Sequence, residues 1–225
     1  MKKKLLLVGL VFAMLFVFAG CEKKEEEKEE KLSGGWEVVT VGNDVAMEEA
    51  EINMFNEAAN GKESLKPIAL LGKQVVAGTN YMFLALDKNV YKVVIVYKDL
   101  EGNASIIKET KFDISKYAHK NIDYNPEALV GGWTVEAPGK VTMLSETVQE
   151  AFDNATSTLT GMTFNPIGVL GKQVVAGTNY AILCYARPST EATQEYIYLL
   201  TLYESLDGKQ EIISTAYVNL ADFNK

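Results

Sequence analysis

The sequence predicts an α+β fold built twice, each time as one helix packed across a four- to five-stranded antiparallel sheet. Two observations lead to this prediction. The eleven residues from Leu71 to Tyr81 recur unchanged from Leu170 to Tyr180. In both copies, an apolar stripe at helical spacing and then alternating apolar and polar runs with glycine turns surround this segment. The repetition therefore indicates two domains that share one plan.

The chain begins with a segment typical of export. Lys2–Lys4 precede an apolar run from Leu5 to Ala19, whose 15 residues are fewer than the roughly 20 that a membrane-spanning helix needs. Residues 1–20 are therefore predicted to be a signal peptide. The site ending in Cys21 resembles a prokaryotic lipoprotein signal, which implies lipidation of Cys21 and an extracytoplasmic, membrane-anchored protein. Phe18 departs from the residues that such signals usually carry three places before the cysteine. Two alternatives therefore stay open: cleavage without lipidation, and an uncleaved anchor.

The charge of the mature chain limits its partners. Loss of the three lysines of the signal peptide leaves 22 − 3 = 19 basic against 30 acidic residues, a net charge of −11. This sign disfavours nucleic acid and anionic lipid headgroups as ligands. Residues 22–31 contain only Glu and Lys, so residues 21–32 are predicted to form a solvated tether.

The first domain is predicted over residues 33–124. Asn43 or Asp44 is expected to cap a helix that ends at Asn60-Gly61. The apolar stripe of this helix comprises Met47, Ala50, Met54 and Ala58. The strands are predicted at residues 66–76, 80–87, 91–97 and 106–112.

The second domain is predicted over residues 131–225, after a linker at residues 125–130. Its helix is expected to start at Ser145 and to end at Thr160-Gly161, with an apolar stripe of Val148, Ala151, Phe152, Ala155 and Leu159. Its last two strands are predicted at residues 196–203 and 211–218. The offset between the copies grows from 99 to 106 along the chain, which places seven extra residues in an enlarged loop around Arg187 to Glu191. A domain of about 95 residues is large enough for a core of its own.

The repeated segment resembles a known family. Gln74-Val75-Val76-Ala77-Gly78, with Gly34-Gly35 about forty residues upstream, is similar to the cystatins, which inhibit papain-like cysteine proteases, and is most like the stefin branch. The resemblance covers roughly residues 33 to 225, because both copies carry both motifs. It implies two tandem cystatin-like domains that inhibit reversibly, by filling the protease cleft on both sides of the catalytic thiolate.

The resemblance also implies which residues contact the protease. The family inserts a wedge of three parts: an N-terminal Gly-Gly trunk, a first hairpin loop and a second hairpin loop. Gly78 and Gly177 are expected at an exposed hairpin apex, where a Trp replacement should leave the domain folded. Carried onto this sequence, the wedge residues are Gly34, Gly35, Gln74, Val75, Val76, Ala77, Gly78 and Leu100, and in the second copy Gly131, Gly132, Gln173, Val174, Val175, Ala176, Gly177 and Leu206.

The second hairpin loop departs from the family pattern. Leu100 and Leu206 match the leucine of the stefins, but Glu101 and Asp207 stand where the stefins have proline. No aromatic residue is present in either loop. Because one buried aromatic contact is worth a few kcal/mol in many interfaces, inhibition is expected to be weaker or more selective.

Other functional classes find little support in the sequence. His119 is the only histidine, so neither a Ser-His-Asp or Cys-His site nor a histidine-rich zinc site can be assembled in both copies. Cys184 lies in an apolar run and is expected to be a buried thiol without a disulfide partner. We therefore expect a monomer that is not an enzyme and needs no metal or cofactor. The alternative function is a surface adhesin or binding module that keeps the fold without inhibition.

Overall fold

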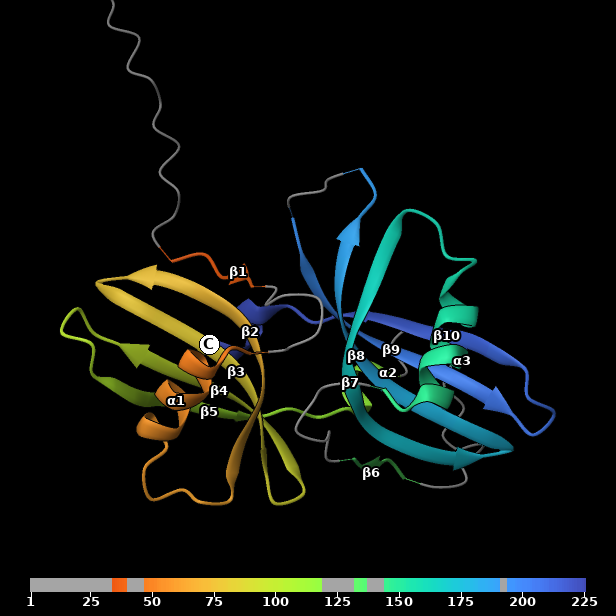
Figure 1. Cartoon of the computed structure of the whole chain (residues 1–225), viewed down its shortest axis with the longest axis horizontal. Helices are drawn as coiled ribbons and strands as arrows, with labels where there is room; N and C mark the ends of the chain where they lie inside the picture. Colours follow the sequence, from red (N-terminus) through yellow and green to blue (C-terminus); the bar gives the residue numbers. More distant parts are fainter. Residues whose placement is uncertain (1–33, 40–46, 119–131, 137–143, 191–193) are drawn as a thin grey trace, which may run out of the picture. The chain divides into compact units, whose positions relative to one another are not determined.

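The computed structural model describes residues 34–39, 47–118, 132–136, 144–190 and 194–225. These residues form two halves of the same plan, each a five-stranded antiparallel sheet with one helix packed against it (Figure 1). This architecture confirms the predicted α+β class. Within these ranges, no helix is long and apolar enough to cross a membrane. The lipidation site Cys21, the tether and the linker at 125–130 lie outside the described residues, so the domain boundaries remain predictions.

The first half contains a sheet in the strand order β1-β2-β3-β4-β5 and the helix α1. Each strand except β1 is joined to the next along the chain by a tight antiparallel connection. The bounds are β1 Glu37–Val38, α1 Glu49–Ala58, β2 Leu65–Val76, β3 Gly78–Asp87, β4 Val90–Lys98, β5 Ala104–Lys111 and α2 Ser115–Ala118.

The second half repeats the plan in the strand order β6-β7-β8-β9-β10. The bounds are β6 Thr134–Val135, α3 Glu146–Thr156, β7 Met162–Val175, β8 Gly177–Pro188, β9 Tyr196–Ser205, β10 Gln210–Tyr217 and the 3-10 helix η2 Leu220–Phe223. The expected loop around Arg187 is only partly a loop, because Arg187 and Pro188 pair with Thr163 and Met162. Part of the insertion therefore lengthens the β7–β8 hairpin.

The start of α1 differs from the sequence prediction. The helix begins at Glu49, so Asn43 and Asp44, which lie outside the described residues, are not its caps. The carboxylate of Glu51 instead accepts a hydrogen bond of 3.0 Å from the backbone N–H of Glu48. Glu48 and Glu51 together form a capping box, which satisfies free backbone N–H groups at the start of the helix. In α3, Ser145 occupies the predicted N-cap position, but its side chain makes no capping hydrogen bond.

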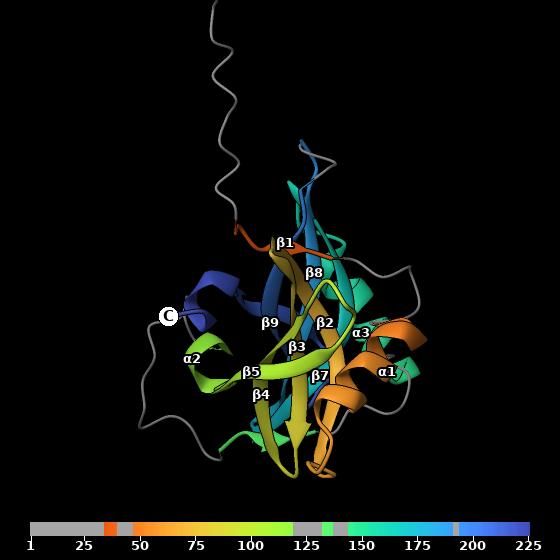
Figure 2. The ribbon, with the colours of Figure 1, turned by 90° about the vertical axis from the view of Figure 1, so that its left-hand side faces the viewer.

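Each helix covers one face of its own sheet. In the first half, α1 lies across one face of the sheet (Figures 1 and 2). The ring of Phe55 from α1 packs edge-on against Phe83 from β3, with a centroid distance of 5.1 Å. In the second half, the stripe of α3 packs on Cys184, Leu200 and other apolar residues of β8 and β9. Val148, Ala151, Phe152 and Ala155 of the predicted stripe are all buried. The prediction for Leu159 was wrong, because α3 ends at Thr156 and Leu159, beyond the helix, is exposed.

The long strands β2 and β7 both bend, which lets each sheet curve around its helix. The pairing of β2 with β3 shifts between Pro67 and Ala69 and again between Leu70 and Gly72. The pairing of β7 with β8 shifts at the matching places. Such bulges increase the local twist and bend the strand. Because the bulges recur at the same positions of the repeat, they are part of the common plan.

The opposite face of each sheet is also apolar and buried. Along β3, Phe83 and Ala85 point to α1, whereas Met82, Leu84 and Leu86 belong to a second cluster on the other face. This cluster contains residues of both halves, and we call it the shared core. Its largest fully buried members are Leu71, Met82, Leu84, Tyr91, Ile95, Ile167 and Leu170.

The residues that follow the last strand of each half belong to the shared core and lie beside the other half. Ile114, which precedes α2, lies beside Gly171 of β7, and Leu220 of η2 lies beside Gly72 of β2. A Cβ atom at Gly72 would lie 2.8 Å from the Cδ1 atom of Leu220. The hydroxyl of Thr201 donates a hydrogen bond of 2.7 Å to the carbonyl of Ala118. The two halves are therefore joined by an apolar interface with buried hydrogen bonds.

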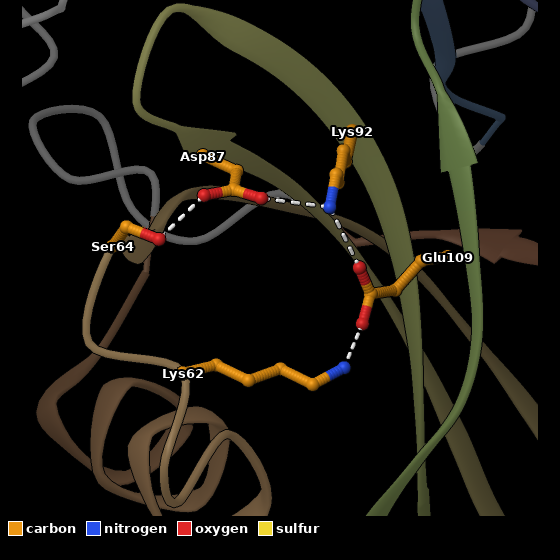
Figure 3. Close-up of polar contacts among 5 residues, drawn as sticks. All are labelled: Lys62, Ser64, Asp87, Lys92 and Glu109. Atoms are coloured by element: carbon orange, nitrogen blue, oxygen red, sulfur yellow. Dashed lines mark hydrogen bonds and ion pairs between the residues drawn. The ribbon is translucent and has the colours of Figure 1, made fainter.

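Four charged side chains and a serine join the α1–β2 connection to the first sheet (Figure 3). Lys92 lies between two carboxylates, at 2.8 Å from Asp87 and 2.9 Å from Glu109. Glu109 also accepts from Lys62, and Asp87 accepts from Ser64 at 2.6 Å. Hydrogen bonds from Lys62 and Lys92 lower the pKa of Glu109, and those from Lys92 and Ser64 lower the pKa of Asp87.

The shared core predicts that the halves unfold together. Leu71→Ala and Leu170→Ala, at matching positions of the two halves, should each cost about 2–5 kcal/mol of stability. Because the core is common to both halves, each change should shift one single transition in urea. The fluorescence of Trp36 and of Trp133, each followed with the other replaced by Phe, reports one half each. Two separate transitions, of which a substitution moves only one, would show that the halves are independent.

The charge network predicts loss of stability in acid. A carboxylate whose pKa is lowered by folding adds stability above its unfolded pKa, and this is lost as the pH falls through the folded pKa. Stability should therefore decline below about pH 5, and Glu109→Gln should make this decline shallower. Urea unfolding between pH 7 and pH 3 measures it. Glu211→Gln, an exposed site in the second half, is the matched control and should leave the slope unchanged.

Candidate functional site

The candidate site of each half lies at one end of its sheet. The β2–β3 hairpin turns at Ala77, between the paired residues Val76 and Gly78. Thr79 pairs with Lys98, the last residue of β4, so the β4–β5 turn lies at the same end of the sheet. The trunk reaches this end as well, because Glu37 pairs with Lys73 and the chain runs from there back toward Gly34.

The structure brings the predicted wedge residues of the first half together. We call Gly34, Gly35, residues 74–78 and Leu100 the first wedge. Its apolar side chains protrude: Val75 is 71% exposed, Val76 39% and Leu100 82%. Large apolar side chains at such exposure form a surface that a partner can bury.

The second half carries a matching arrangement. We call Gly132, residues 173–177 and Leu206 the second wedge. Val174 is 71% exposed and Leu206 is 88% exposed, which closely matches their counterparts in the first wedge. Gly131, also predicted as part of this trunk, lies outside the described residues.

Gln74 supports the first wedge from inside. Its side chain is only 7% exposed, and its amide donates a hydrogen bond to the carbonyl of Gly34. Its carbonyl oxygen accepts from Asn80 at 2.7 Å. Both of these contacts are with its own chain. Gln74 thus holds the trunk beside the hairpin.

The second wedge repeats the bond between the glutamine and the asparagine. Gln173 is 2% exposed, and its side-chain oxygen accepts a hydrogen bond of 2.9 Å from Asn179. The two asparagines belong to the segment that is identical in both halves. The sequence therefore shows that both halves carry this asparagine, but only the register of the hairpin shows that Asn80 lies opposite Gln74.

Two tyrosines that the sequence analysis did not select fix the hairpin apex. Tyr97 from β4 donates a hydrogen bond of 2.5 Å to the carbonyl of Ala77. Tyr203 from β9 donates one of 2.6 Å to the carbonyl of Ala176. Both lie at the same position of the repeat, since 203 − 97 = 106, the offset at the second turn. The matching positions of Tyr97 and Tyr203 could have been noticed in the sequence. Tyrosine is also common on the surface of a sheet, so the alternating strand pattern gave no reason to select them.

The apex glycines are enclosed rather than exposed, which corrects the sequence-based expectation. Gly78 and Gly177 do have positive φ values of +119° and +131°, as a hairpin apex requires. A Cβ atom would lie 2.4 Å from the carbonyl oxygen of Lys98 in the first case and 2.2 Å from that of Glu204 in the second. The neighbouring strand therefore fills the space, and a Trp replacement cannot leave the hairpin unchanged.

The two second turns are closed by different side chains. In the first half, the carboxylate of Asp99 accepts from the backbone N–H of Asn103 at 2.8 Å and from its side chain at 2.9 Å. These bonds lower the pKa of Asp99. In the second half, the hydroxyl of Ser205 accepts from the backbone N–H of Lys209 at 2.9 Å. Both closures leave the leucine at the tip of the turn in solvent.

The described residues were also compared with the requirements of a metal site. No group of three or more His, Cys, Asp or Glu side chains in the ranges that the structure describes is placed to hold a metal ion. Cys184 is buried and has no disulfide, as predicted, and burial raises the pKa of its thiol. Trp36 and Trp133 pack against the shared core.

Comparison with known proteins identifies no relative of this chain. No family model, no curated protein and no solved structure matches it. The two halves, each one helix on a five-stranded antiparallel sheet, are therefore described by their own geometry. The resemblance to the cystatins rests on the repeated motifs.

The apex geometry predicts unequal effects of alanine at neighbouring glycines. Gly78→Ala should destabilise the protein by about 1–3 kcal/mol, because the new Cβ requires a strained backbone and meets a carbonyl oxygen. Gly35→Ala is the control within the same wedge, since nothing lies within 4 Å of a Cβ there. Urea unfolding compares the two. Equal, small effects would mean that the apex adopts another conformation.

Proposed function

We propose that the chain is a reversible inhibitor of papain-like cysteine proteases, and that each half can insert its wedge into a protease cleft. The observation that carries the proposal is the meeting of three separate segments, the trunk, the first hairpin and the second turn, at one end of each sheet. These are the segments that the resemblance to the cystatins implies.

The chemistry of the wedge suits occlusion of a cleft. Burying one exposed Val or Leu side chain contributes about 1.5–3 kcal/mol, and each wedge offers Val75 and Leu100 or their counterparts. The hydrogen bonds of Gln74 and Tyr97 hold the loops in place before binding. Little conformational entropy is then lost when a partner binds.

The membrane anchor belongs to the same proposal. Lipidation of Cys21 would hold the inhibitor at the extracytoplasmic side of a membrane, and the charged residues 22–31 would keep the wedges away from the bilayer. The negative net charge is consistent with this, because it prevents the wedges from settling on anionic headgroups.

Titration of active papain with residues 32–225 tests the function. The unaltered chain should inhibit two protease molecules per chain, and Val75→Asp or Val174→Asp should each reduce this number to one. A buried carboxylate without a partner costs several kcal/mol, so each change should remove one wedge. Val90→Asp is the matched control, because Val90 is 40% exposed at the opposite end of the sheet.

The outcomes separate the proposal from its alternative. Inhibition that both wedge substitutions leave unchanged would remove the wedges from the mechanism. Absence of inhibition by a folded, unaltered chain would favour the adhesin or binding module, which uses the same exposed surface for a partner that is not a protease.

A further inference from the structure

The tip of the second turn of each wedge combines a protruding leucine with an acid. Leu100 is followed by Glu101, and Leu206 is followed by Asp207. Both leucines are more than four-fifths exposed, and both acids are exposed. The same pair therefore leads each wedge, although the residues that close the two turns differ.

The two acids differ in what already surrounds them. Asp207 lies 3.3 Å from the ammonium group of Lys209 and accepts a hydrogen bond of 2.5 Å from Ser205. Among the described residues, no cation lies within ion-pair distance of the carboxylate of Glu101. The other acid of the first turn, Asp99, is occupied by Asn103. Glu101 is thus the uncommitted negative charge at the tip of the first wedge.

The strand ends behind the tips carry the opposite pattern. Lys98 precedes the first turn, whereas Glu204 occupies the matching position of the second half. The carboxylate of Glu204 accepts from the hydroxyl of Tyr180 at 3.1 Å. The tip of the first wedge therefore carries the carboxylate of Glu101, unpaired among the described residues, and the strand before it ends in Lys98. At the tip of the second wedge, Lys209 compensates the charge of Asp207.

We propose that Glu101 selects the protease partner: the first wedge favours papain-like proteases that carry a lysine or arginine on the cleft rim beside an apolar subsite. This inference rests on the proposed function and adds the chemistry of the partner. Leu100 fills the apolar subsite while Glu101 meets the basic group. A protease with an acidic rim is disfavoured, because like charges then face each other across a desolvated contact.

The expected effect lies mainly in the association rate. Complementary charges at the rim of an interface steer the encounter, and salt screens this effect. Glu101 makes the leading edge of the wedge negative, so it should speed association with a basic rim at low ionic strength. Asp207 should contribute less, since Lys209 already offsets its charge.

The test isolates the first wedge by using residues 32–225 with Val174→Asp. In this background, association rates are measured with two papain-like proteases, one with a basic and one with an acidic cleft rim, at about 20 mM and 300 mM salt. Glu101→Gln should slow association with the basic enzyme roughly 3- to 10-fold at low salt. The difference should shrink at high salt, and Glu101→Lys should reverse the preference between the two enzymes.

Two controls separate the possible failures. Glu63→Gln removes the same charge from an exposed site before β2, at the other end of the sheet, and should leave the rates nearly unchanged. Equal rates for Glu101→Gln and Glu63→Gln would overturn the selective role of Glu101 while leaving inhibition intact. Absence of inhibition by the unaltered chain would overturn the proposed function, and this inference with it.

Discussion

The structure depends on one constraint: each sheet must bury both of its faces. A helix covers one face, and the shared core covers the other. Strands buried on both faces need apolar residues at successive positions rather than in alternation. The run from Met82 to Leu86 meets this need, since every one of its side chains is at most 8% exposed. The contacts of α2 and η2 follow from the same constraint, because they add apolar side chains to the shared core.

The sequence predicted the elements of the fold well because the signals were local. Helical spacing, glycine turns and the unchanged repeat indicate the strands and most of the buried side of α3. The predicted stripe of α1 was partly wrong, because Ala50 is exposed and Phe55, which was not in the stripe, is fully buried. The strand bounds differ from the prediction by only a few residues. The predicted start of α1 was wrong because Glu48 and Glu51 cap the helix, whereas the prediction assigned the cap to Asn43 or Asp44.

The features that the sequence did not predict are contacts between distant residues. Met82 and Leu84 look like ordinary strand residues, and only the structure shows that they share a core with Ile167 and Leu170. The enclosure of Gly78 has the same origin, since the obstructing carbonyl belongs to Lys98, twenty residues later in the chain. The residue types at the candidate site were therefore predictable, but the packing that holds them was not.

The position of η2 has a consequence for biosynthesis. Leu220 and Phe223 belong to the shared core, and Leu220 lies beside Gly72 of β2, which comes far earlier in the sequence. Domains made on the ribosome commonly fold one after another, starting from the N-terminus. Here the first half cannot complete its core until η2 has been made. Its apolar face stays uncovered during synthesis, so a chain that ends early cannot reach the complete fold.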